Sequence, residues 1–177
     1  MNQNCLPPEE SNWSAIPDFT NGACIVRVFF YGLFMDESLL ATKGIEPSEV
    51  ILGFVDGYGL RIGERATLVR RPDSRAYGAM MDITPSEATK LYAEESVADY
   101  VPESVIVELM DGTQVEAICY NLPGDKVTGA NKEYAESLLD IATRLDFPDS
   151  YLDQIRRART SRILGLPTGR PQFAILS

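Results

Sequence analysis

Apolar residues in the first two thirds of the chain cluster in short runs that are typical of β-strands. Branched and aromatic side chains favour extended backbone, and they dominate residues 24–31, with the sequence CIVRVFFY. Similar runs predict strands at 50–55, 59–62, 66–70 and 77–83, with a turn at Arg71-Pro72-Asp73-Ser74. Two further strands, at 104–109 and 115–120, flank Asp111-Gly112, a pair that indicates a β-hairpin.

Helical signals fall between and after these strands. Asp36 is a suitable N-cap for a short helix over 37–43, and Gly44 is a natural stop. Thr84-Pro85-Ser86-Glu87 has the residues of a capping box and predicts a helix that runs to Glu94 or Glu95. Apolar residues recur every three or four positions over 130–145, which predicts a helix with one buried face, and Pro148 opens a last helix.

The order of these elements predicts an α+β fold. Strands come first, with helices inserted between them and then appended, and there is no β-α-β-α alternation of the kind that builds a Rossmann sheet. Residues 1–22 are rich in Pro, Asn and Ser, which predicts an irregular N-terminal arm before a single domain over 23–177.

The composition restricts the cellular compartment and the classes of binding partner that we expect for this protein. Hydrophobic residues make up 45% of the 177 residues, which is typical of a globular chain, and no apolar run reaches the roughly 20 residues that span a bilayer. The first residues lack the basic start and apolar stretch of a signal peptide, so we expect a cytoplasmic protein, either a monomer or a homodimer. A net charge of -10 disfavours binding to nucleic acid or to an anionic membrane.

The chain contains no histidine. This excludes Ser-His and Cys-His nucleophiles and the common catalytic zinc sites, and the three cysteines do not have metal-ligand spacing. We therefore expect neither a metal nor a cofactor. Acid/base chemistry near neutral pH must then come from a carboxylate, Lys, Tyr or Cys.

Two segments are candidates for chemistry. Phe30-Tyr31-Gly32-Leu33-Phe34-Met35 is a strand end that runs into a loop before a capped helix, where unpaired backbone N–H groups suit an anion or a carbonyl oxygen. An ordinary strand-to-helix turn has the same pattern. Glu94 and Glu95 lie at the predicted C-terminal end of a helix, where the helix dipole and mutual repulsion favour a protonated carboxyl. The alternative for this pair is two solvated surface charges.

Weaker candidates lie elsewhere. Asp146-Phe147-Pro148-Asp149-Ser150-Tyr151 reads as a helix start with an aromatic residue on the core face. Arg61, Arg65, Arg70 and Arg71 lie in the β-rich region, where one of them could meet a substrate carboxylate and the others could line the outer face of a strand.

Together and in this order, these segments resemble the γ-glutamylcyclotransferase-like family. Tyr31-Gly32-Leu33-Phe34-Met35 is similar to the family's Tyr-Gly-Ser-Asn or Tyr-Gly-Thr-Leu strand end, and Leu91 to Ser96 is similar to its Leu-Asp-x-x-Glu-Gly motif, followed by Tyr100 and a hairpin. Residues 147–155 and Gly165-Leu166-Pro167 resemble a later segment of the animal branch. The resemblance covers about residues 25 to 167.

The resemblance implies a small mixed β-barrel flanked by helices. It places Glu95 on the catalytic glutamate, and it implies a substrate site at Tyr31, Gly32, Leu33, Phe34, Met35, Tyr100 and Tyr151. The implied reaction is the cyclisation of a small γ-glutamyl compound, which releases 5-oxoproline and an amine or amino acid without a cofactor.

The chain departs from the family pattern at two places. Leu33-Phe34 replaces a small polar pair, and Ser96 replaces the glycine after the glutamate. Three functions therefore stay open: an enzyme that releases 5-oxoproline, a protein of the same fold that binds a γ-glutamyl-like or other acidic metabolite without turnover, and an interaction module in which Glu95 is a surface charge.

Overall fold

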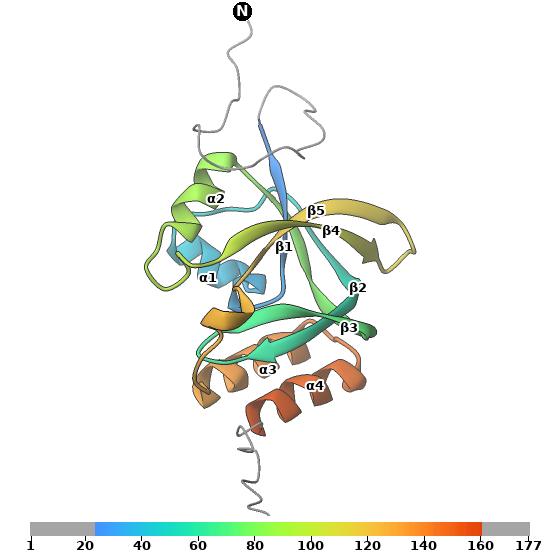
Figure 1. Cartoon of the computed structure of the whole chain (residues 1–177). Helices are drawn as coiled ribbons and strands as arrows, with labels where there is room; N and C mark the ends of the chain where they lie inside the picture. Colours follow the sequence, from blue (N-terminus) through green and yellow to red (C-terminus); the bar gives the residue numbers. More distant parts are fainter. Residues whose placement is uncertain (1–23, 161–177) are drawn as a thin grey trace, which may run out of the picture.

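The computed structural model describes residues 24–160, which form a closed barrel of five β-strands with four α-helices around it (Figure 1). The strands are β1 (Val26–Phe30), β2 (Val50–Ile62), β3 (Ala66–Ile83), β4 (Val101–Leu109) and β5 (Gln114–Asn121). The helices are α1 (Glu37–Thr42), α2 (Pro85–Tyr92), α3 (Lys132–Arg144) and α4 (Asp149–Thr160), with short 3-10 turns η1 (Leu33–Met35) and η2 (Gly124–Lys126).

The barrel has the strand order β1-β3-β2-β4-β5. Neighbouring strands are antiparallel, except that β1 and β5 close the barrel as a parallel pair with Val28 opposite Ile118. The expected α+β barrel flanked by helices is thereby confirmed. The predicted arm lies outside the described residues.

The predicted turn at residues 71–74 is wrong. These residues lie inside β3, and the register of the β2–β3 pair passes from Asp56 opposite Arg75 to Tyr58 opposite Arg70. Four residues of β3 thus face the single residue Gly57, whose φ of +78° suits glycine. The turn-forming residues make a bulge instead of a chain reversal, because pairing resumes with the same partner strand on both sides.

The predicted helix starts are confirmed by their caps. The Asp36 side chain accepts a hydrogen bond from the backbone N–H of Ser38 at the start of α1. Thr84 and Glu87 form both hydrogen bonds of a capping box at the start of α2. Since local residues satisfy these helix ends, the helices begin where the sequence indicates.

The core lies inside the barrel and beneath the helices. Val28, Phe29 and Met81 of β1 and β3 are fully buried, and α3 and α4 lie side by side next to the long β2–β3 hairpin (Figure 1). Leu138 of α3 and Ile155 of α4 are fully buried there. The helical stripe predicted from residue spacing therefore packs as expected.

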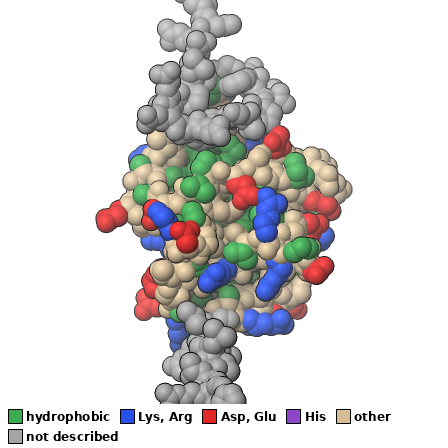
Figure 2. Space-filling view, viewed as in Figure 1, with side chains coloured by type: hydrophobic (Ala, Val, Ile, Leu, Met, Phe, Trp, Pro, Cys, Tyr) green, Lys and Arg blue, Asp and Glu red, His purple; other side chains and the backbone are tan. Residues whose placement is uncertain are grey.

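The described surface mixes both signs of charge. On the face shown in Figure 2, Lys and Arg side chains lie among Asp and Glu side chains, so this face carries no extended basic patch. Among the described residues, no helix is long and apolar enough to cross a membrane.

Candidate functional site

The loop between β1 and α1 is held in one shape by its own backbone. The N–H of Met35 donates to the carbonyl of Gly32 at 3.1 Å, and the N–H of Asp36 donates to the carbonyl of Leu33 at 3.0 Å. The Asp36 carboxylate, which caps α1, also accepts a hydrogen bond from Arg144 of α3 at 2.8 Å. The loop is therefore tied to both α1 and α3.

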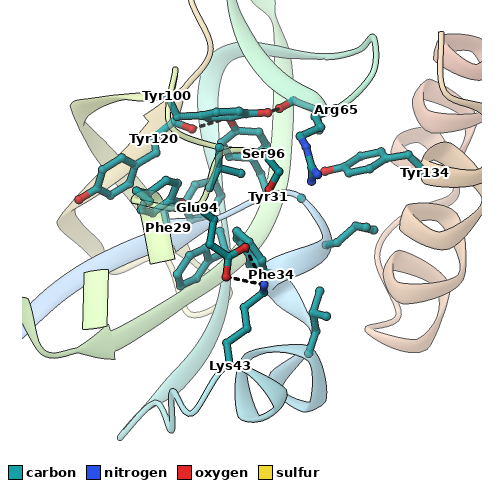
Figure 3. A pocket seen from close by; sticks show the side chains of 17 residues that line it. Phe29, Tyr31, Phe34, Lys43, Arg65, Glu94, Ser96, Tyr100, Tyr120 and Tyr134 are labelled. Carbon is teal, nitrogen blue, oxygen red and sulfur yellow. Dashed lines mark hydrogen bonds and ion pairs between the residues drawn. The ribbon is translucent and has the colours of Figure 1, made fainter. Parts of the chain in front are cut away.

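A cavity of about 240 Å³ opens beside this loop (Figure 3). Tyr31, Gly32, Leu33 and Phe34 line it from the loop. The remaining lining residues come from β1, α1 and its C-cap, the β2–β3 connection, the start of β3, the end of α2 and the segment after it, β5 and α3. They are Phe29, Phe30, Leu39, Lys43, Arg65, Ala66, Tyr92, Glu94, Ser96, Val97, Tyr100, Tyr120 and Tyr134.

Tyrosines form much of the wall, and the hydroxyls of two of them donate hydrogen bonds to backbone carbonyls. The Tyr31 hydroxyl donates to the carbonyl of Tyr120 at 2.6 Å, and the Tyr100 hydroxyl donates to the carbonyl of Ala66. The rings of Tyr92 and Tyr120 stack with their centroids 3.6 Å apart. Burial raises the pKa of Tyr120 to about 12, and it also raises the pKa of Tyr31 well above its usual value. These phenols therefore stay protonated at neutral pH and act as hydrogen-bond donors.

Tyr134 is a cavity residue that sequence reasoning missed, because its position in an apolar helical stripe indicated a core role. Burial raises the pKa of Tyr134, while hydrogen bonds from the backbone N–H groups of Ala66 and Leu33 and the charge of Arg65 act in the opposite direction. A Cβ atom on Gly32 would lie 2.7 Å from the Tyr134 hydroxyl oxygen. Gly32 therefore allows this hydroxyl to sit directly against the loop.

Lys43 and Glu94 form an ion pair at the edge of the same cavity (Figure 3). The Lys43 ammonium lies 2.6 and 2.7 Å from the two carboxylate oxygens of Glu94, and 5.8 Å from the centre of the Phe34 ring. The pair joins the end of α1 to the segment after α2, and it occupies both oxygens of Glu94. Sequence reasoning missed Lys43, since nothing in the chain order places it near Glu94.

The segment that carries Glu94 and Glu95 is not helical, which corrects the predicted end of α2. The helix stops at Tyr92, and two turns follow, closed by hydrogen bonds from Val97 N–H to Glu94 and from Tyr100 N–H to Val97. Ser96 does not adopt a positive φ. A glycine is therefore not needed for this backbone conformation, and the departure from the family pattern carries no strain.

Glu95 lines a second, smaller cavity of about 140 Å³. This cavity shares Arg65, Ser96 and Tyr100 with the first, so the two adjoin. Its other lining residues are four polar or charged residues and two apolar ones: Glu64, Asp99, Lys126, Thr128, Leu122 and Val127. Lys126 is paired with Asp99, whereas no hydrogen bond or ion pair holds the exposed Glu95 carboxylate among the described residues.

Two other candidate residues lie away from both cavities. Met35 is buried, with 2% of its surface exposed, and packs in the core below the loop. Tyr151 is fully buried on α4, where its ring packs against Tyr77 and Phe147 at centroid distances of 5.3 and 5.9 Å. Gly165-Leu166-Pro167 lies outside the described residues. Within the described part of the chain, no cluster of Cys, Asp or Glu side chains could hold a metal ion.

Comparison with known proteins agrees with this architecture. Residues 75–155 match the AIG2-like family. A solved structure described as a γ-glutamyl cyclotransferase aligns with a TM-score of 0.60 at 15% identity, covering 75% of this chain and 86% of the other. The γ-glutamylcyclotransferase-like resemblance is confirmed.

Two other structures share the γ-glutamylcyclotransferase-like fold. An uncharacterized human protein aligns with a TM-score of 0.62 at 15% identity, over 75% of this chain and 86% of that one. YkqA from Bacillus subtilis aligns with a TM-score of 0.65 at 20% identity, over 77% of this chain and 55% of YkqA. No curated protein sequence matches the chain. At these identities the likeness concerns the fold.

Proposed function

We propose that the protein is a γ-glutamylcyclotransferase-type enzyme that converts a small γ-glutamyl compound into 5-oxoproline and a free amine or amino acid. The observation that supports this most is the pair of adjoining cavities. One is bounded by the Tyr31–Phe34 loop and the other by Glu95, with Arg65, Ser96 and Tyr100 common to both. A ligand that occupies both would meet the loop and a free carboxylate at once.

The reaction suits this arrangement. The α-amine of the substrate attacks its own γ-carbonyl carbon, a new C–N bond closes the ring, and the bond from the γ-carbon to the leaving nitrogen breaks. The proton that leaves the α-ammonium group is returned to the departing amine. Because nucleophile and carbonyl belong to one molecule, holding the chain in a folded conformation supplies much of the rate.

A backbone N–H group near the start of η1 is a suitable donor to the developing oxyanion. The first N–H groups of a helical turn have no partner within that turn. Leu33 and Phe34 stand at this position and line the cavity. The N–H of Leu33 bonds to the Tyr134 hydroxyl, so the N–H of Phe34 is the donor that we propose for the oxyanion.

Glu95 is the proposed proton carrier. Glu94 lines the loop cavity, but Lys43 engages both of its oxygens. A carboxylate that must accept and release a proton in each cycle needs an oxygen that is free to do so. Glu95 meets this requirement, and Glu94 holds Lys43 and the segment after α2 in place.

Glu95→Gln and Glu94→Gln test this assignment as a matched pair. We expect Glu95→Gln to lower kcat by about 10²–10⁴-fold with little change in KM, because the change removes the base and keeps the shape. Glu94→Gln should lower kcat much less. Release of 5-oxoproline from a panel of γ-glutamyl dipeptides and γ-glutamyl amines provides the measurement. Parental kcat in Glu95→Gln would contradict the assignment.

A second function is binding of a γ-glutamyl-like or other acidic metabolite without turnover. It is favoured by the position of Glu95, which is exposed and lines the second cavity instead of the loop cavity. In that case calorimetry detects binding of 5-oxoproline or a γ-glutamyl dipeptide, and the parent protein releases no 5-oxoproline.

A further inference from the structure

We propose that Arg65 is the specificity-determining residue that binds the α-carboxylate of the γ-glutamyl substrate. This inference rests on the proposed function, because it concerns how the same site recognises its substrate. Arg65 lies in the short connection between β2 and β3 and lines both cavities. Figure 3 shows its side chain extending into the loop cavity, with the guanidinium group beside the Tyr134 hydroxyl.

Arg65 differs from the other arginines of the β-rich region. Arg70 is paired with Glu103 and lies over the Tyr58 ring, and Arg61 and Arg71 are exposed and line neither cavity. Arg65 is half-buried, and no carboxylate lies within ion-pair distance of it in residues 24–160. A half-buried guanidinium without an anionic partner is a ready site for a ligand carboxylate.

The charged side chains that line the loop cavity also support Arg65 as the carboxylate-binding residue. The cavity has two cationic side chains, Lys43 and Arg65, and one carboxylate, Glu94. Lys43 is neutralised by Glu94, so the positive charge that remains belongs to Arg65. Glu64 and Glu95 line the second cavity beside Arg65, but neither forms an ion pair with it among the described residues.

The backbone around Arg65 is fixed. The carbonyl of Arg65 accepts a hydrogen bond from Gly63 N–H at 3.0 Å, and the carbonyl of Gly63 accepts one from Asn131 N–H at 3.0 Å. Glu64 N–H donates to Thr128 at 2.8 Å. The connection is thus bound to the segment before α3, and these bonds hold the backbone of Arg65 in place beside both cavities.

A carboxylate bound at Arg65 would also orient the other groups of the substrate. The α-carboxylate and the α-ammonium group share one carbon atom, so a carboxylate at Arg65 keeps the ammonium group near the boundary with the second cavity, which Glu95 lines. The γ-carbonyl then extends toward the loop. The leaving group is left among Leu33, Phe34 and Leu39, which form an apolar wall.

Two substrates that differ only in the α-carboxylate test the inference. A γ-glutamyl anilide cyclises to 5-oxoproline, and the 4-aminobutyryl anilide, which lacks the carboxylate, would cyclise to 2-pyrrolidinone with the same leaving group. We expect the parent protein to prefer the γ-glutamyl anilide by at least about 10²-fold in kcat/KM, because the second compound leaves Arg65 unpaired. Arg65→Gln should reduce this preference to below about 10-fold.

Control variants separate recognition from folding. Arg71→Gln removes an exposed arginine of the same region and should leave the preference unchanged. Arg65→Lys keeps the charge but not the planar fork, so it should restore the preference only in part. A thermal melt of each variant checks that the barrel is intact. An Arg65→Gln protein that is folded and keeps the parental preference would overturn the inference.

Binding of the products gives a measurement that does not depend on turnover. By calorimetry, the parent protein should bind 5-oxoproline and not 2-pyrrolidinone, and Arg65→Gln should lose this difference. If no γ-glutamyl compound is turned over while 5-oxoproline binds in an Arg65-dependent way, the proposed enzyme activity fails and the role of Arg65 stands. If the parent turns substrate over but binds both products equally, the role of Arg65 is refuted while the activity stands.

Discussion

Gly32 shows how one residue shapes the cavity. Its backbone is extended, with φ of -107°, so glycine is not required there by conformation. Glycine is instead required for steric reasons, because a Cβ atom at this position would lie 2.7 Å from the Tyr134 hydroxyl oxygen. We expect Gly32→Ala to displace this hydroxyl from the loop and to lower the free energy of unfolding by about 1–3 kcal/mol.

A double-mutant cycle measures this contact directly. Tyr134→Phe removes the oxygen that the new methyl group would meet. Gly32→Ala should therefore cost less in the Tyr134→Phe background than in the parent, by at least about 0.5 kcal/mol in urea unfolding. Additive effects of the two substitutions would show that the crowding is absorbed elsewhere.

At the scale of the element, the start of α2 depends on its capping box. Thr84 Oγ1 accepts from Glu87 N–H at 3.2 Å, and the Glu87 carboxylate accepts from Thr84 N–H at 2.8 Å. Thr84→Ala should lower the free energy of unfolding by about 1 kcal/mol, and Thr84→Ser should not. Kinetic constants should change little, because the cavity lies beyond the other end of α2. A loss of activity larger than the loss of stability would contradict this separation.

At the scale of the whole molecule, the seam between β2 and β4 is the sparsest antiparallel part of the barrel. Only Gly53–Leu109 and Phe54–Glu108 pair across it. Glu103 of β4 reinforces it with its side chain, which accepts hydrogen bonds from Tyr58 of β2 at 2.7 Å, from Arg70 of β3 and from Asn121 of β5 at 2.9 Å. One carboxylate therefore ties four strands together.

This arrangement predicts a pH-dependent contribution to stability. Burial alone raises the pKa of Glu103, but the hydrogen bonds from Tyr58, Asn121 and Arg70 outweigh it, so the pKa of this carboxyl lies below its usual value. A carboxyl with a lowered pKa stabilises the fold above its unfolded pKa of about 4.3, and this contribution is lost as the pH falls through the folded pKa.

Glu103→Gln should accordingly lower the free energy of unfolding at pH 7 by about 1–3 kcal/mol. The difference from the parent should shrink below about pH 4, where Glu103 becomes protonated. Glu116→Gln is a suitable control, because Glu116 is exposed and bonds only with Ser104 of the neighbouring strand among the described contacts. Urea unfolding of the three proteins between pH 3 and pH 7 provides the comparison.

Short-range patterns in the sequence were enough to predict several helices and strands and the loop after β1. The caps at Asp36 and Thr84, the hairpin at Asp111-Gly112 and the helical stripe of α3 all depend on residues within a few positions of one another, so sequence spacing is enough to find them. The loop from Tyr31 to Phe34 is likewise recognisable from adjacent residues, and in the structure it lines the larger cavity. Residues 71–74 are an exception, because pairing with β2 overrides their turn propensity. The end of α2 is another, because the helix stops at Tyr92 instead of Glu94 or Glu95.

Only the tertiary structure decided which distant side chains meet at the cavity. Lys43 reaches Glu94 across 51 positions of sequence, and Arg65 and Tyr134 come together from β2–β3 and α3. Tyr151 packs in the core under α4, away from both cavities. Periodicity reports whether a side chain is buried but not which neighbours it meets, since these depend on barrel closure and on how the helices pack. Only the folded structure therefore shows that Glu94 neutralises Lys43 while Arg65 has no carboxylate partner among the described residues.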